Sequence, residues 1–147
     1  MVKARQRSAA PEKANPASGN YRAMQIFEVL DSGAAVPLDK AQVFPQAIVF
    51  NRGNLSTILS DPSAEVKTAA NNDPAMSRGV DRNYQYVKFL YLRDGGTDLK
   101  STGGTAWCVT LQNINDPPDG AKLPANFVTV QVDPVSGAMR IFRPSLP

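Results

Sequence analysis

The sequence predicts a mainly β protein of the α+β type, with antiparallel strands and one or two short helices. Its apolar residues are rich in Val, Ile, Phe and Tyr, which are favoured in strands, while 12 prolines and 10 glycines supply turn signals along the chain. A chain of 147 residues, 42% of them hydrophobic, can bury one substantial core but is too short for two comfortable domains. We therefore expect one domain built from many short strands.

The positive charge of the chain is concentrated at its start. Residues 1–22 hold five basic residues and one acidic residue, a net charge of +4, so the other 125 residues carry −1 of the total of +3. Residues 1–20 are also rich in Ala, Pro and Ser, which predicts a flexible basic arm or loop ahead of a single domain over residues 21–147. Basic arms can bind phosphate backbones, but no aromatic residue interleaves with these charges, so a solvated tail is favoured over DNA binding.

The first strand is predicted over Tyr21–Leu30, which has apolar residues on both sides. One side carries Tyr21, Ala23, Phe27 and Val29, and the other carries Met24, Ile26 and Leu30. A strand that is apolar on both faces needs cover on both. The residues Asp-Ser-Gly at 31–33 then predict a turn that returns the chain as a short partner strand over residues 34–38.

Shorter elements are predicted up to residue 83. Pro45 breaks any strand ladder, and Asp61 with Pro62 suits a helix start, as an N-cap acceptor followed by a first-turn proline. The predicted elements are a strand at Ala47–Phe50, a helical turn within residues 54–59 and a helix over residues 63–70. The stretch that ends at residue 83 is polar and irregular, which predicts an exposed loop. We call residues 60–83 the excursion.

The longest strand candidate is Tyr84–Leu92, which we place in the sheet centre because both of its faces are apolar. Turns are predicted at residues 93–96 and at Gly103–Gly104, on either side of a short extended piece at residues 97–99. The next strand is predicted over Thr105–Leu111. Its apolar face consists of Trp107, Val109 and Leu111.

The chain closes with a predicted hairpin over Phe127–Phe142. Successive side chains of its first strand alternate across the pleat, which makes the strand half-buried. Asp133 and Pro134 suit the first two positions of a type I turn, and Gly137 can adopt the positive φ that brings the chain back. The residues expected to face the core are Val128, Val130, Val132 and Ile141.

No catalytic, cofactor-binding or metal-binding residue is predicted. The chain has no histidine, which removes the commonest general base, the usual Ser and Cys triads and most zinc sites. Its single cysteine, Cys108, cannot form an intramolecular disulfide and does not favour a thiolate metal site. Cys108 lies between Trp107 and Val109, so we expect a buried thiol with a raised pKa that packs in the core.

The run RDGGTD contains the one pair of carboxylates that could flank a small site, Asp94 and Asp98. Turn chemistry is favoured, with Asp94, Gly95 and Gly96 as hairpin turn residues and Asp98 exposed. The run lacks the alternating acidic ligands and the closing glutamate of an EF-hand, so calcium binding is a minor alternative. The two Gly-Gly pairs of the chain do not have phosphate-loop spacing, and we interpret both as turns.

Nucleic-acid stacking and membrane insertion find little support. Tyr84, Tyr86 and Tyr91 could stack on bases or sugars from an exposed face, but packing within strands is favoured for aromatic residues. The chain has no apolar run of about 18 residues and no visible signal peptide, so we expect it to be soluble.

Six stretches, taken in order, resemble one known family. They are NYRAMQIFEV, PLDKAQVFPQAIVF, LSTIL, YVKFLYLRDGGTDL, AWCVTLQN and LPANFVTVQVDPVSGAMRIFRP. Together they resemble the prepilin-like family called Verru_Chthon cassette protein D, a type IV pilin-like group related in general plan to minor pseudopilins of type II secretion. The resemblance covers about Tyr21 to Pro144 without residues 60–83, and its most specific pieces are the DGGTDL turn and the closing DPVSG hairpin with its RP end.

The resemblance implies a non-catalytic structural subunit of a type IV pilus-like or pseudopilus assembly. In such a protein, a prepilin leader precedes a long apolar helix, which anchors the protein in the inner membrane and joins it to other subunits, while a β-sheet head faces the periplasm or the exterior. This sequence departs from that pattern, because no leader, cleavage motif or apolar helix precedes Tyr21, and we expect it to be the head alone. A head without its helix is expected to expose an apolar groove or to self-associate through it.

Three other functions remain as alternatives. The head could be a filament-tip module that binds DNA or an exported substrate through the basic tail and the loops. A β-rich phage or capsid accessory protein would share the strand-rich composition and the lack of catalytic groups, and would need no upstream helix. A carboxylate enzyme would require Asp94 and Asp98 to converge in a cleft.

Overall fold

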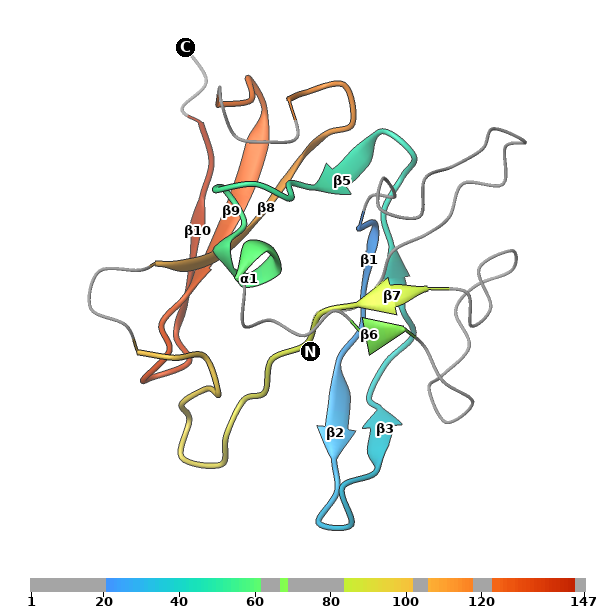
Figure 1. Ribbon diagram of the computed structural model, residues 1–147, viewed down its shortest axis with the longest axis vertical. Coiled ribbons are helices and arrows are strands. Elements are labelled where there is room, and N and C mark those ends of the chain that lie inside the picture. Colours follow the sequence, from blue (N-terminus) through green and yellow to red (C-terminus); the bar gives the residue numbers. More distant parts are fainter. Residues whose placement is uncertain (1–20, 62–66, 69–83, 102–105, 118–122, 145–147) are drawn as a thin grey trace.

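The computed structural model describes residues 21–61, 67–68, 84–101, 106–117 and 123–144. These residues form antiparallel strands and one short helix, which confirms the predicted mainly β class (Figure 1). The strands are β1 (Ala23–Met24), β2 (Phe27–Val29), β3 (Ala35–Pro37), β4 (Gln42–Val43), β5 (Ile48–Phe50), β6 (Lys67–Thr68), β7 (Gln85–Tyr86), β8 (Trp107–Asn113), β9 (Phe127–Val132) and β10 (Met139–Phe142), and the helix is α1 (Thr57–Ser60). Among the described residues, no helix is long and apolar enough to cross a membrane.

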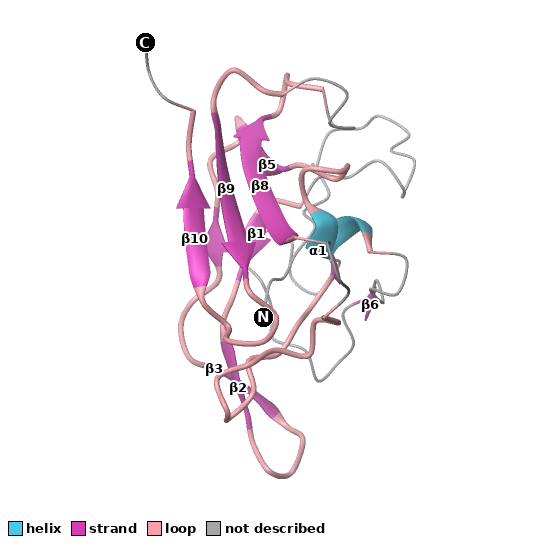
Figure 2. Ribbon diagram, turned by 90° about the vertical axis from the view of Figure 1, so that its left-hand side faces the viewer, coloured by secondary structure: helices cyan, strands magenta, loops and turns pink. Residues whose placement is uncertain are grey.

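A four-stranded antiparallel sheet in the order β10-β9-β8-β5 is the largest unit of the fold (Figure 2). Its two central strands are the longest, with 7 residues in β8 and 6 in β9. Directly opposed residues share a face, so Trp107 and Val132 lie on one side of the sheet, while Cys108 and Gln131 lie on the other. The strand predicted over Thr105–Leu111 is confirmed from Trp107 onward as β8, which continues to Asn113. The closing hairpin predicted over Phe127–Phe142 is confirmed as β9 and β10.

The main core lies on one side of this sheet, where α1 and the segment after β7 cover it. Ile58 of α1 is only 2% exposed and packs there with Val87 and Phe89. The buried members of the cluster are Tyr21, Phe50, Ile58, Val87, Phe89, Trp107, Val109 and Val132. Leu111 and Val130 are only partly buried and pack at its margin, so the core covers the middle of the sheet rather than all of it.

The start of α1 covers the edge of β8 beyond the end of β5. The Cys108 N–H donates to the Thr57 hydroxyl oxygen (2.8 Å), and the Thr110 N–H donates to the Ser56 hydroxyl oxygen (2.9 Å). The Thr57 hydroxyl in turn donates to the Ala106 carbonyl oxygen (2.7 Å). These two hydroxyls take the place of a neighbouring strand, and for this reason the Ser56 side chain forms no capping hydrogen bond with its own helix.

The remaining strands form three two-stranded pairs, β1 with β4, β2 with β3, and β6 with β7. A smaller cluster of Ala23, Tyr84 and Tyr86 links β1 to β7. The β2–β3 hairpin extends beyond this cluster to the lower end of the molecule in Figure 1, and its turn contains Gly33 with a φ of 79°. We call residues 26–38 the arm.

The segment Tyr84–Leu92 is not the central strand that we predicted. Only Gln85–Tyr86 form a strand, β7, and the far end of the segment pairs through a single bridge between Tyr91 and Thr97. The segment is apolar on both sides because its residues enter two different clusters, the smaller one near β1 and then the main core. The sheet centre belongs to β8 and β9.

The segment Tyr21–Leu30 is not a single strand with two covered faces. It divides into β1 and β2, and Phe27 is buried while Met24 and Ile26, on the other side, are exposed. Val29 was predicted on the buried side but is 44% exposed. Phe27 on the same side is 8% exposed, so the cover of this side ends between Phe27 and Val29 as the hairpin extends away from the core.

The prediction that Ile141 faces a covered core is also wrong. Ile141 lies opposite Val130 and so on the core side of the sheet, yet it is 63% exposed. It belongs to β10, the outermost strand, and the core ends at β9. Val132 is buried as predicted, whereas Val128 and Val130 are half-buried.

Other predictions are confirmed in part or lie outside the described residues. α1 overlaps the predicted helical turn at residues 54–59, and β3 and β5 lie within their predicted ranges. Lys67–Thr68 form β6, so the predicted helix over residues 63–70 is wrong at these two positions. The basic segment 1–20, the turn at Gly103–Gly104 and most of the 60–83 excursion lie outside the described residues.

Candidate functional site

The two turns that form the most specific part of the family resemblance contact each other. The Thr97 N–H and the Thr97 hydroxyl both donate to the Pro134 carbonyl oxygen (2.9 and 3.1 Å). A Cβ atom at Gly137 would collide with the Gly95 carbonyl oxygen and would lie 3.1 Å from the Tyr91 ring. Glycine is therefore required here by lack of space as well as by the φ of 65° at Gly137.

Asp133 stabilises the second of these turns. Its Oδ1 accepts hydrogen bonds from the N–H groups of Val135 (2.9 Å) and Ser136 (2.8 Å). The backbone hydrogen bonds from Ser136 and Val135 hold the pKa of Asp133 below its ordinary value, because they favour the charged carboxylate. The predicted role of Asp133 in the turn is confirmed.

Asp94 and Asp98 are engaged with the backbone around the RDGGTD turn. Asp94 Oδ1 accepts the Gly96 N–H (2.9 Å), and Asp98 Oδ1 accepts the Leu90 N–H (2.7 Å). Both aspartates are exposed, as predicted for turn residues. In the part of the chain that the structure describes, no three His, Cys, Asp or Glu residues gather as a metal site.

Cys108 is half-buried and points to the side of β8 opposite Trp107, so the prediction that it packs in the core is wrong. Its Sγ lies 3.5 Å from the Thr57 hydroxyl oxygen and 3.5 Å from the Leu55 carbonyl oxygen. Neither group is a base that could take the thiol proton. The surroundings of Cys108 therefore provide no activated nucleophile.

The tyrosine side chains are used in packing. Tyr84 and Tyr86 are 2% and 8% exposed, and their ring centroids lie 6.1 Å apart, which confirms the packing interpretation for these two residues. Tyr91 is 46% exposed, and its ring centroid lies 5.4 Å from that of Phe89. Partial burial raises the pKa of the Tyr91 hydroxyl by desolvation.

A groove of about 710 Å³ lies at the end of the four-stranded sheet, where β8 ends and β9 begins. Its wall includes Leu111 and Val128, which are cross-strand partners on the core side of the sheet. The residues that line it include the apolar Ile48, Leu111, Phe127 and Val128, the asparagines Asn113, Asn115 and Asn126, and Arg143. None of these residues is a buried member of the main core, and Leu111 packs against it, so the groove lies at the core margin.

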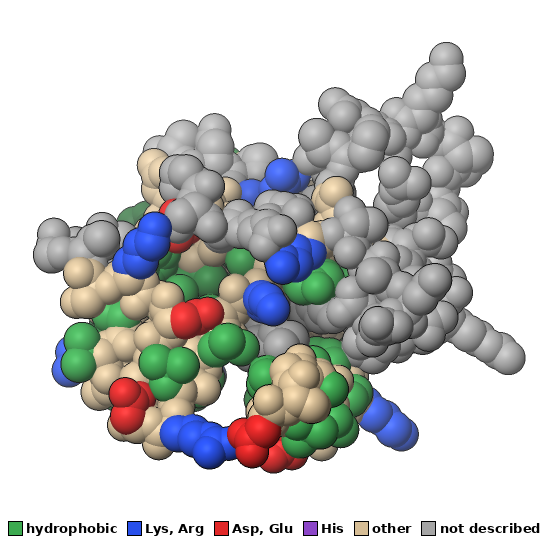
Figure 3. Space-filling model, turned by 60° about the horizontal axis from the view of Figure 1, so that its bottom comes forward, with side chains coloured by type: hydrophobic (Ala, Val, Ile, Leu, Met, Phe, Trp, Pro, Cys, Tyr) green, Lys and Arg blue, Asp and Glu red, His purple; other side chains and the backbone are tan. Residues whose placement is uncertain are grey.

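The arm presents a second apolar surface. In its register, Glu28 lies opposite Val36, and the Leu38 N–H donates to the Ile26 carbonyl oxygen (3.0 Å). The same side of the hairpin therefore carries Ile26, Glu28, Leu30, Val36 and Leu38, which are all exposed, and we call these residues the arm face. Figure 3 shows this end of the molecule, with hydrophobic side chains gathered on one lobe beside charged ones.

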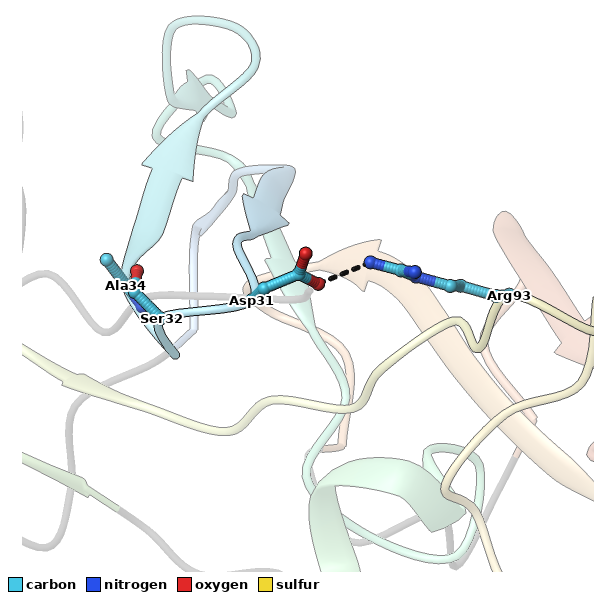
Figure 4. Close-up of polar contacts among 4 residues, drawn as sticks. All are labelled: Asp31, Ser32, Ala34 and Arg93. Atoms are coloured by element: carbon cyan, nitrogen blue, oxygen red, sulfur yellow. Dashed lines mark hydrogen bonds and ion pairs between the residues drawn. The ribbon is translucent and has the colours of Figure 1, made fainter.

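An exposed ion pair connects the arm to the rest of the molecule. The Arg93 guanidinium donates to the Asp31 carboxylate across the space between the two turns (Figure 4). Both side chains are 89% exposed, so water and salt screen the pair, and it adds little to stability. The arm is held mainly by its own hairpin.

The residues that line the groove were not identified in the sequence. The signal that could have found them is the asparagines at strand ends, with Asn113 and Asn115 at the end of β8 and Asn126 just before β9. The apolar side of Tyr21–Leu30 was recognised, but as a face that needed cover. The proposed DNA-binding tail, residues 1–20, lies outside the described residues.

The described residues thus define a mainly β domain with an antiparallel sheet, one short helix and two uncovered apolar surfaces, the groove and the arm face. Comparison with known proteins finds no matching family model, no matching curated protein and no matching solved structure. The family resemblance and the functions that it implies therefore stay predictions.

Proposed function

We propose that the chain is the head domain of a pilin-like subunit, a non-catalytic structural component of a type IV pilus-like or pseudopilus assembly in the cell envelope. The observation that carries this proposal is the groove. Leu111 and Val128 turn half-buried apolar side chains to the core side of the sheet at the margin of the core, and both line the groove. An uncovered apolar face of this kind suits a sheet that receives a helix from elsewhere in the protein.

The position of Tyr21 supports the same interpretation. The Phe50 N–H donates to the Tyr21 carbonyl oxygen (2.9 Å), so the chain passes alongside β5 as it enters the described fold. Ile48 lies two residues before Phe50 on the same strand and lines the groove. Two residues of a strand span about 7 Å, so the described fold begins close to one wall of the groove.

In this proposal the helix anchors the subunit in the inner membrane and joins it to other pilin-like subunits, while the head faces the periplasm or the exterior. The head contributes shape and contacts rather than chemistry. This role agrees with the engagement of Asp94, Asp98 and Asp133 in backbone hydrogen bonds of turns.

The deciding experiment is to determine the N-terminus of the native gene product, by reading the gene upstream of Met1 and by mass spectrometry of the cellular protein. We expect a short prepilin leader followed by an apolar helix that runs into this chain. An upstream sequence without an apolar helix would overturn the proposal.

A second measurement tests the groove directly. The native upstream helix is fused to the head, and methyl NMR signals are compared with those of the head alone. The signals of Ile48 and Val128 should shift, while those of Val135, an exposed residue of the β9–β10 turn, should not. Unchanged groove signals in the fused protein would contradict helix binding at this site.

A further inference from the structure

The outermost strand of the main sheet carries exposed apolar and basic side chains. β10 pairs only with β9, so its other edge has no strand partner among the described residues. Met139 and Ile141 are 64% and 63% exposed and lie on the same side, as does Arg143 by alternation along the chain. We call these three residues the β10 strip. Residues 138–144 contain two arginines and no acidic residue, a net charge of +2.

The arm face has the opposite charge and a similar apolar character. Val36 and Leu38 are 43% and 62% exposed, and Glu28 lies among the apolar residues of the face. Glu28 is the one charged member of the arm face, and Asp31 in the adjoining turn is paired with Arg93. An apolar face with a central carboxylate complements an apolar strip that ends in an arginine.

We propose that the arm face of one copy of this chain packs against the β10 strip of a second copy. Three observations favour a second copy as the partner: the opposite charges of Glu28 and Arg143 on the two surfaces, their shared apolar character, and the edge of β10 that no described strand pairs with. Pro37 lacks an N–H donor, so the contact consists of side-chain packing rather than a continuous strand ladder. The contact involves only described residues, and Arg143 is the member of the β10 strip that also lines the groove.

The two surfaces are different, so the contact is heterologous. Figure 1 shows β10 along one side of the molecule and the arm at its lower end. Each copy therefore has one arm face and one β10 strip, which can contact two different neighbours. A heterologous contact whose rotation does not close a ring builds an open chain of copies. The expected product is a series of oligomers rather than a dimer alone.

The test uses two variants, Leu38→Lys in the arm face and Ile141→Lys in the β10 strip. Both positions are more than 60% exposed, so the fold should tolerate them, and far-UV circular dichroism with thermal unfolding verifies this. Leu123→Lys is the matched control, because Leu123 is 62% exposed, as is Leu38, and belongs to neither surface. Sedimentation velocity over a range of concentrations measures the association.

We expect the average mass of the wild-type chain and of Leu123→Lys to rise with concentration beyond that of a dimer. Each of the other two variants should weaken association roughly 10-fold to 100-fold, the change expected from one lost apolar side chain. An equimolar mixture of Leu38→Lys and Ile141→Lys should form dimers and nothing longer, because one intact arm face then meets one intact strip. Added NaCl should weaken all these contacts.

A wild-type chain that stays monomeric at all concentrations would overturn the inference. So would a Leu38→Lys chain that dimerises as tightly as the wild type, since this would mean that two copies associate without the arm face. Neither result bears on the upstream helix, whose presence is read from the gene, so failure of this inference and failure of the proposed function can be told apart.

Discussion

The four-stranded sheet and the arm are built from similar alternating sequences, but they bury their apolar residues to very different extents. In β8, Trp107 and Val109 are 5% and 9% exposed, whereas the apolar residues of the arm face are between 42% and 62% exposed. Alternation decides which side chains share a face, and it does not decide whether that face is covered. The cover comes from elements that lie elsewhere in the chain.

β8 is covered from three directions. β9 pairs along one edge, the hydroxyls of Ser56 and Thr57 bond to the other edge, and Ile58 packs on the core side. Among the described contacts, the arm has its own hairpin, an exposed ion pair and the buried side chain of Phe27, and a two-stranded hairpin by itself is marginally stable in water. The same kind of substitution should therefore lower the unfolding free energy strongly in the sheet region and only slightly in the arm.

The largest difference in lost unfolding free energy is expected between Ile58→Ala and Leu38→Ala. Ile58 is 2% exposed, so its truncation leaves a cavity in the main core and should cost about 2–5 kcal/mol of unfolding free energy. Leu38 is 62% exposed, and its truncation should stay within about 0.5 kcal/mol. Urea unfolding followed by fluorescence of Trp107, the single tryptophan, measures both. Equal losses would contradict the contrast between the two regions.

A smaller difference in lost stability is expected between Gly137→Ala and Gly33→Ala. Both glycines have positive φ, but a Cβ at Gly33 would meet nothing within 4 Å, while one at Gly137 would collide with the Gly95 carbonyl. Gly33→Ala should cost about 1–2 kcal/mol from backbone strain, and Gly137→Ala about 2–4 kcal/mol because overpacking adds to that strain. Thermal unfolding of the two variants side by side tests this order, and the reverse order would argue against the close contact of the turns.

Two serines give a third comparison. Ser56→Ala removes the acceptor of the buried Thr110 N–H and should cost about 1–3 kcal/mol. The Ser32 hydroxyl accepts the Ala34 N–H at 3.4 Å in the exposed arm turn, so Ser32→Ala should stay within about 0.5 kcal/mol. Amide hydrogen exchange at Thr110 should accelerate in the first variant alone. If exchange at Thr110 is unchanged, the hydroxyl does not protect this edge.

The smallest effect expected is a pH dependence of the β9–β10 turn. The pKa of Asp133 is lowered in the folded state, so the folded protein binds this proton more weakly than the unfolded chain. The resulting stabilisation is fully present above the ordinary aspartate pKa and is lost as the pH falls through the lowered pKa. The difference in unfolding free energy between the wild type and Asp133→Asn should therefore shrink on acidification. A difference that does not change with pH would exclude this contribution.

Local features were predictable from the sequence because their causes are local. The hairpins closed at Gly33 and Gly137 follow from turn residues between alternating strands, and alternation places Trp107, Val109 and Leu111 on one face of β8. The role of Asp94 as a turn residue follows in the same way from its place before two glycines.

Features that depend on distant partners were not predictable. Tyr84–Leu92 has the pattern of a central strand, but its residues serve two clusters, and Ile141 has the pattern of a core residue but lies on the outermost strand. The thiol of Cys108 was assigned to the core from its neighbours in sequence, although alternation turns it toward Thr57. The groove lies where β8 ends and β9 begins; the asparagines near these strand ends are a local signal, but they do not show that the two ends meet in space.

The hydroxyl bonds along β8 also have a consequence for the order of folding. They join residues far apart in sequence, with a separation of 51 positions from Thr57 to Cys108 and of 54 from Ser56 to Thr110. A hairpin such as β9–β10 forms in about 1–10 μs, while contacts across such long loops form later because loop closure costs more entropy. The edge of β8 therefore stays open to other unfolded chains until α1 docks, and the yield of refolding will fall as the chain concentration rises.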